Sequence, residues 1–204
     1  MSEISQGRYL IDRSRLPVDY PAHRHKAEFW EALGRAVATF GFLEEVLLKA
    51  IFALTATTHV EMGNAETAYA EWAKKLKRSL SEPLRKLIDT FGKAVRENQD
   101  STLENLDDLL ADLRQVASIR NVICHGSWPP PDASGACIPF YVNRNGEKFE
   151  TPVDTAYLNQ LRGVACDLAC SVIDTVTHMG WQFPGSDGPG RIVWTRSMTQ
   201  WCST

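Results

Sequence analysis

The chain has 204 residues and a formal net charge of −3 at pH 7, with 44% apolar and 23% charged residues. This length and composition fit one globular domain with some additions, and they exclude a fibre or a largely disordered chain. The small negative charge excludes a uniformly basic protein, so a polyanion would have to bind at a local patch.

No stretch of the sequence approaches the roughly 18 apolar residues that a membrane span requires, and residues 1–19 lack the apolar core of a signal peptide. We therefore expect a cytoplasmic protein without membrane contact. The five cysteines are odd in number and lack a CxxC spacing, which favours reduced thiols. Cys166 and Cys170 could share a metal ion, but we expect small buried side chains there, and neither a metal nor a cofactor.

Residues 1–25 predict a basic N-terminal arm. Arginine and histidine residues are interleaved with tyrosine and proline without a helical or strand period, as in a tail that lies on the surface. A basic arm that carries tyrosines could also touch a phosphate backbone.

A long helix is predicted from about residue 26 to residue 57. Side chains three and four residues apart form one seam, and Glu44 is its only polar member. An unpaired carboxylate costs several kcal/mol to bury, so Glu44 needs a cation or another polar partner. The apolar members of the seam are Trp30, Leu33, Val37, Phe40, Leu47, Ile51 and Leu54.

Two shorter helices follow, over residues 65–80 and from Ser81-Glu82-Pro83 to about Asn98. Ser81 is the expected cap of the second, because proline is harmless in a first turn. The junction between them is the most basic part of the chain and is either a solvated face or a patch that offsets the acidic total. Its cations are Lys74, Lys75, Lys77, Arg78, Arg85 and Lys86.

A fourth helix is predicted from a cap at Ser101 or Thr102. Its apolar seam continues into Arg120 and Cys124, so an arginine lies where a leucine is expected. We predict that Arg120 meets Glu44. Gly126 is the expected left-handed residue that ends this helix, and Pro129-Pro130-Pro131 prevents its resumption.

A polar edge formed by Arg114, Ser118, Asn121 and His125 runs beside that seam at helical spacing. Arg120 and His125 are about 140° apart around an ideal helix, so they share no face if the helix is regular. We expect His125 to stand past the helix end and to swing toward Arg120. A partner related by a two-fold axis would bring a second Arg–His set opposite the first.

The remaining chain predicts a β-hairpin, a last helix and an aromatic tail. Residues 137–152 alternate in hydrophobicity around Asn145-Gly146, as in a hairpin with a tight turn. Asp154 is the expected cap of a helix that stops at Gly180. In the tail, residues 181–204, we expect the large aromatic side chains to cover the bundle or a partner. They are Trp181, Phe183, Trp194 and Trp201.

The stretch Arg120-Asn121-Val122-Ile123-Cys124-His125 resembles the RNxxxH form of the Rx4-6H motif of HEPN domains (higher eukaryotes and prokaryotes nucleotide-binding). Phe40-Gly41-Phe42-Leu43-Glu44 on a first helix is consistent with this resemblance, which covers about residues 26–180. It implies an all-α, HEPN-like bundle of about five helices, here with an inserted hairpin.

The resemblance further implies a metal-independent endoribonuclease of the toxin or defence type. It would act at the cleft of a homodimer through attack by the ribose 2′-hydroxyl, and RNA and an antitoxin protein would be its partners. His125 would be the general acid or base, Arg120 would neutralise the phosphate, and Asn121 would orient either group. Glu44 and Ser118 would support them. Some relatives carry a modifiable tyrosine two residues after the histidine, where this chain has Ser127.

The same residues also fit other classes of protein. Arg120 could form a structural ion pair with Glu44 and His125 could cap a helix end, as in a non-catalytic HEPN-like module that binds nucleotides or proteins. A DNA-binding regulator is disfavoured, because no recognition helix with base-reading side chains stands out.

Overall fold

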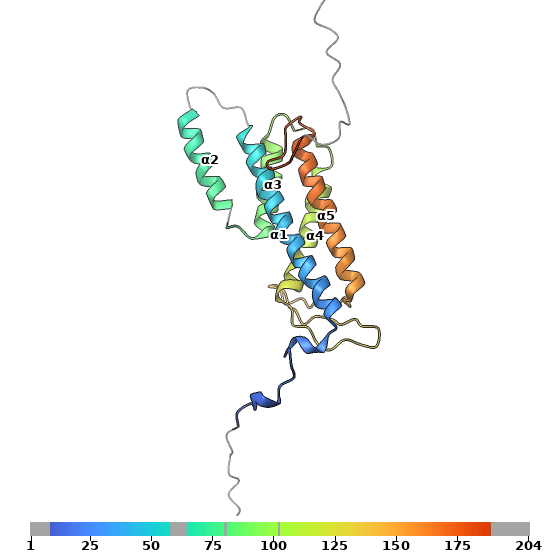
Figure 1. Ribbon diagram of the computed structural model, residues 1–204. Coiled ribbons are helices and arrows are strands. Elements are labelled where there is room, and N and C mark those ends of the chain that lie inside the picture. The colour runs from blue at the N-terminus through green and yellow to red at the C-terminus, as the bar shows by residue number, and fades with distance from the viewer. Residues whose placement is uncertain (1–8, 58–64, 80, 102, 189–204) are drawn as a thin grey trace, which may run out of the picture.

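The computed structural model describes residues 9–57, 65–79, 81–101 and 103–188. Within them the chain is mostly helical, which confirms the predicted all-α class. Its five helices are α1 (Ala27–Ala56), α2 (Ala65–Ser79), α3 (Leu84–Glu97), α4 (Leu106–His125) and α5 (Thr155–Thr177), and two short 3-10 turns, Arg13–Arg15 and Ala22–Arg24, precede them. Successive helices run in alternating directions (Figure 1).

Helix α1 is the centre of the bundle. It packs most extensively against α5 and also contacts α2, α3 and α4. The predicted seam is buried at Phe40, Leu47 and Leu54, and a second row of side chains that includes Leu43 widens the buried face. One 30-residue helix therefore organises the core, because every other helix lies against it.

Helix α2 stands apart from the other four helices (Figure 1). Its described attachment to α1 is a small aromatic cluster, in which the rings of Phe52 and Tyr69 lie 5.5 and 5.6 Å from that of Trp72. The indole N–H of Trp72 donates a hydrogen bond of 2.9 Å to Thr55 Oγ1. Much of the surface of α2 is therefore left to solvent.

Two of the predicted helix caps are wrong and one is confirmed. Helix α4 begins after Asn105, beyond the predicted caps, of which Thr102 lies outside the described residues. Pro83 occupies the cap position of α3, while the Ser81 hydroxyl donates to Arg78 O at the end of α2. Asp154 caps α5 as predicted, because its carboxylate accepts a 2.7 Å hydrogen bond from the Tyr157 N–H.

Gly126 ends α4 for a different reason from the predicted one. Its φ is −71°, so the backbone is not left-handed there. A Cβ at this position would lie 2.6 Å from Val122 O and 3.2 Å from the side chain of Pro139. A glycine is required because the chain passes so close to the last turn of α4.

The connection from α4 to α5 does not form the continuous strands of the predicted hairpin 137–152. The described residues hold three isolated antiparallel bridges, Ser127–Phe140, Cys137–Val153 and Val142–Lys148, and no strand. A turn does form around Gly146, whose φ is +82°. The alternating apolar side chains of Ile138, Phe140 and Val142 are exposed, because no second layer covers them.

The predictions for the tail and the cysteines are only partly correct. Phe183 is buried as expected, but Trp181 is half exposed. Trp194 and Trp201 lie outside the described residues. Cys166 and Cys170 are exposed on α5, so the prediction that they are buried is wrong. Both cysteines lie in a helix as predicted, but their side chains are on the face of the helix that contacts solvent.

None of the described helices combines the length and the apolar character that crossing a bilayer demands.

Two phenylalanines of α1 test how the core is held. Phe40 is 1% exposed and Phe42, two residues further on, is 46% exposed. We expect Phe40→Ala to lower the free energy of unfolding by about 3–5 kcal/mol, because it leaves a cavity in the core. Phe42→Ala, the matched control, should cost less than about 1 kcal/mol. Urea denaturation of both variants measures the difference, and equal losses would mean that α1 is rotated relative to this structure.

Candidate functional site

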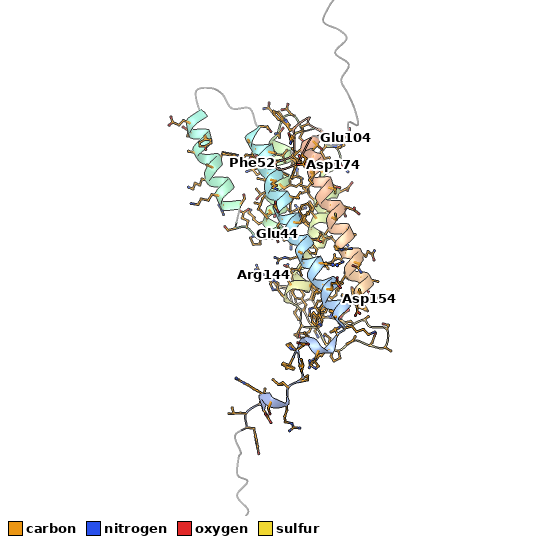
Figure 2. All side chains as sticks on the ribbon, viewed as in Figure 1. Glu44, Phe52, Glu104, Arg144, Asp154 and Asp174 are labelled. Atoms are coloured by element: carbon orange, nitrogen blue, oxygen red, sulfur yellow. The ribbon has the colours of Figure 1, made fainter. Side chains whose placement is uncertain are left out.

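The two charges that the sequence places in apolar seams do meet. Arg120 Nη2 lies 3.4 Å from Glu44 Oε1, which joins α4 to α1. Both side chains are 30% exposed, so the pair is less buried than its seam positions suggest. Figure 2 shows Glu44 near the middle of the bundle, well away from Asp154 at the start of α5.

The Glu44–Arg120 pair lies near the start of α3. The side-chain amide of Asn98, just after α3, donates to Leu54 O near the end of α1. Counting back along the 14 residues of α3 places its start level with about residue 40 of α1. By the same count Glu44 is level with about residue 88, so the Glu44–Arg120 pair lies beside the first two turns of α3.

The polar edge of α4 is open to solvent. Ser118, Asn121 and His125 are all exposed. The Ser118 hydroxyl donates a 2.6 Å hydrogen bond to Gln115 O within the helix. Within the described residues, the side chains of Asn121 and His125 make no hydrogen bond or ion pair. Both groups are therefore available to a ligand or to another protein chain.

The last turn of α4 remains regular, which contradicts the expectation that His125 stands past the helix end. Helix α4 includes His125, and the Gly126 N–H donates a 2.7 Å hydrogen bond to Val122 O. Arg120 and His125 therefore keep their separation of about 140° around the helix axis. Arg120 faces α1, and His125 points to another side of the bundle, so one chain does not bring the two together.

The loop that follows the RNxxxH stretch is fixed by a histidine that the sequence assigned to the N-terminal arm. His25 is buried, and its Nε2 lies 2.8 Å from Pro129 O. Its ring stacks on Phe29 at 4.2 Å, and Phe29 in turn contacts the Trp128 ring at 5.2 Å. This cluster ties the start of α1 to the chain just beyond His125.

A neighbouring hydrogen bond extends the same attachment. The Trp30 indole N–H donates to Ala22 O at 2.7 Å, which holds the 3-10 turn Ala22–Arg24 against α1. The available signal in the sequence was the pair of aromatic residues, Phe29 and Trp30, about one helical turn after His25. It was missed because the arm has no period and His25 was grouped with the exposed basic residues.

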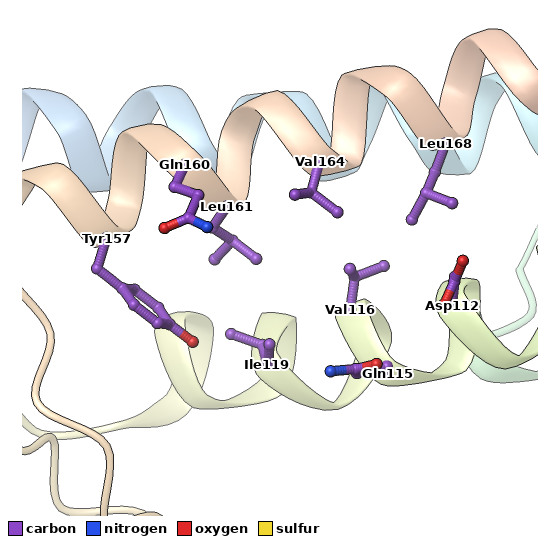
Figure 3. A pocket seen from close by; sticks show the side chains of 9 residues that line it. All are labelled: Asp112, Gln115, Val116, Ile119, Tyr157, Gln160, Leu161, Val164 and Leu168. Atoms are coloured by element: carbon purple, nitrogen blue, oxygen red, sulfur yellow. The ribbon is translucent and has the colours of Figure 1, made fainter.

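A groove of about 340 Å³ lies between α4 and α5 (Figure 3). Val116, Ile119, Leu161, Val164 and Leu168 make its apolar walls, with Asp112, Gln115, Gln160 and Tyr157 as its polar groups. Burial raises the pKa of Tyr157. The α4 residues of this groove lie on a different face from Asn121 and His125 by helical geometry, so the groove is separate from the RNxxxH edge.

The arrangement of possible metal ligands in the described residues differs from that of a metal site. In residues 9–57, 65–79, 81–101 and 103–188, no three histidine, cysteine, aspartate or glutamate side chains gather as metal ligands do. The pKa of Cys170 is raised, first by burial and then by the nearby Cys166 and by acidic residues.

Comparisons of the chain with protein-family models, with curated proteins and with solved structures gave no match. The function must therefore be inferred from the residues of the site.

The ion pair makes a specific stability prediction. Because Glu44 and Arg120 are both partly exposed, we expect Glu44→Gln to lower the free energy of unfolding by about 1 kcal/mol or less. A double-mutant cycle with Arg120→Gln should give a coupling of about 0.5–1 kcal/mol. The Asp89–Arg114 pair, at 2.9 Å and also partly exposed, is the matched control. A loss of about 3 kcal/mol for Glu44→Gln would show that the pair is buried in solution.

The His25 cluster makes a second prediction. His25→Phe keeps the ring stack on Phe29 but removes the hydrogen bond to Pro129, and should cost about 1 kcal/mol. His25→Ala removes both and should cost about 2 kcal/mol. Thermal unfolding measures the losses, and limited proteolysis should cut the 126–135 loop faster in His25→Ala. His178→Ala, at an exposed position after α5, is the control. Unchanged stability of His25→Ala would refute the anchoring role.

Proposed function

We propose that the chain is a HEPN-like, metal-independent endoribonuclease of the toxin or defence type, acting as a cytoplasmic homodimer. The observation that carries this proposal is the exposed imidazole of His125, one helical turn from the Asn121 amide, at the end of the helix that also holds Arg120; neither side chain has a polar partner in the part of the chain that the structure describes. The HEPN-like unit would comprise residues 26–180.

A second copy of the chain is essential to the proposal. Arg120 and His125 diverge by about 140° within one regular helix, so a phosphodiester cannot bridge them in a single subunit without rearrangement. Two α4 ends packed around a two-fold axis would place His125 of one subunit beside Arg120 of the other. The exposed Asn121 and Cys124 would then lie in the interface.

The chemistry follows from the residue types. Imidazole titrates near neutral pH, so His125 suits the removal of a proton from the ribose 2′-hydroxyl or its delivery to the leaving 5′-oxygen. The guanidinium of Arg120 offers a planar set of donors for phosphate oxygens, and Glu44 would hold it in place. Attack by the 2′-oxygen on the phosphorus releases the 5′-oxygen and leaves a 2′,3′-cyclic phosphate. DNA would not be cleaved, because it has no 2′-hydroxyl.

The Glu44–Arg120 contact favours a second candidate function. An arginine that already has a carboxylate partner is partly neutralised, and a phosphate would have to compete for it. A non-catalytic HEPN-like module that binds nucleotides or a protein would need Arg120 only to fix α4 against α1. An antitoxin protein is a candidate partner in either case.

RNA cleavage in the presence of EDTA tests the enzymatic proposal. We expect purified protein to degrade total RNA to products with 2′,3′-cyclic phosphate ends, because the reaction needs no metal ion. His125→Ala and Arg120→Ala should each reduce the rate at least a hundredfold, while His178→Ala leaves it unchanged. Equal decay with all variants would identify a contaminant, and no decay with the wild type would favour the binding module.

A mixture of two inactive variants tests whether the site is shared between subunits. If Arg120 of one subunit acts with His125 of the other, co-expressed Arg120→Ala and His125→Ala chains should recover about a quarter of the wild-type activity. Half of randomly paired dimers are mixed, and each of these keeps one of its two sites intact. No recovery in mixtures that size-exclusion chromatography shows to be dimeric would place both groups of each site in one chain.

A further inference from the structure

Ion pairs line the seam between α3 and α4 at a constant register. Arg96 of α3 pairs with Asp107 of α4, and Asp89 pairs with Arg114 at 2.9 Å. The second pair lies seven residues earlier in α3 and seven residues later in α4 than the first, as expected for antiparallel helices. Four more residues in each direction place Arg85 opposite Ser118.

The series of ion pairs stops at this third position. Arg85 lies on the same face of α3 as Asp89 and Arg96, at a spacing of four and then seven residues. The residue opposite it carries a hydroxyl instead of a carboxylate. Within the described part of the chain, Arg85 and its neighbour Lys86 are exposed and form no ion pair. Among the described residues, the guanidinium of Arg85 at this end of the seam is therefore left without a carboxylate that neutralises its charge.

The polar edge of α4 continues directly from this position. Asn121 lies one turn beyond Ser118, and His125 lies one turn further, about 10 Å along the axis from Ser118. Further cations precede Arg85 at the end of α2, where Lys74 and Lys77 are exposed and, among the described residues, unpaired. Arg78 is partly neutralised by Glu82 at 3.7 Å.

We propose that Arg85, with Lys86 beside it and Ser118 opposite, forms a subsite for a phosphodiester of a single-stranded RNA next to the one at His125. This inference rests on the proposed ribonuclease function and names where the substrate strand runs. Arginine binds phosphate oxygens with two donors at once. Ser118, whose hydroxyl donates to Gln115 O, brings no negative charge that would compete with the phosphate. The basic residues at the end of α2 extend the path of the strand away from α4.

Binding of an RNA that cannot be cleaved tests the subsite without requiring turnover. The probe is a fluorescent single-stranded oligonucleotide with 2′-O-methyl groups, which lacks the attacking hydroxyl, and the readout is anisotropy over a range of salt concentrations. We expect Arg85→Glu to weaken binding about tenfold. It should also reduce the slope of log affinity against log salt by about 0.7 for each phosphate that the variant no longer neutralises. Arg85→Lys should retain most of the affinity.

Lys93→Glu is the matched control, because it makes the same charge change at an exposed position of the same helix, at a residue whose ion-pair partner among the described residues is Glu97. Its affinity should stay within twofold of the wild type. Equal affinities for wild type, Arg85→Glu and Lys93→Glu would overturn the subsite, and the ribonuclease proposal would stand if cleavage persists. Loss of binding in Arg85→Glu without any cleavage by the wild type would support the subsite and reject the enzyme.

Two further outcomes would overturn the inference. If the wild type binds neither this RNA nor a cleavable one, the subsite falls together with the proposed function. If Arg85→Glu loses binding to vesicles of phosphatidylserine while no RNA binds, the basic surface serves an anionic membrane.

Discussion

The contact between Glu44 and Arg120 ties the RNxxxH helix to α1 at one point of the apolar interface, and it selects a register rather than supplying much stability. It joins the longest helix, α1, to α4 at the level where α3 begins. Apolar side chains could pack α4 against α1 in more than one register, whereas a single carboxylate and a single guanidinium meet in only one. The pair therefore helps to select the register of α4 against α1, while the Arg96–Asp107 and Asp89–Arg114 pairs set its register against α3.

The same contact turns Arg120 away from His125. The two residues are separated by five positions in a helix that stays regular to its last residue. The anchoring of the following loop by His25 opposes any unwinding that would bring them together, because Pro129 is held just four residues after His125. Both ends of the stretch are thus fixed, and under the proposed function a second subunit would bring the two side chains together.

The helices were predictable from the sequence because periodicity reports burial averaged over many residues. The meeting of Glu44 and Arg120 was predictable for the same reason, since a charge in an apolar seam must find a partner. The wrong predictions concern single residues whose environment is set by distant chain segments. Gly126 responds to Pro139, the burial of His25 depends on Pro129, and the isolated bridges replace a hairpin because no layer covers Phe140.

The positions of the cations are more informative about function than their number, because some cations hold helices together and others do not. Arg96, Arg114 and Arg120 each have a carboxylate, and these pairs fix α4 against α3 and α1. Among the described residues, four cations outside ion pairs, Lys74, Lys77, Arg85 and Lys86, lie at the end of α2 and the start of α3, while the others are spread over the arm, the α4–α5 connection and α5. A protein with a net charge of −3 has enough carboxylates to neutralise them, so their isolation follows from where the acids are placed. An anionic ligand at this end of the bundle would supply the missing negative charge.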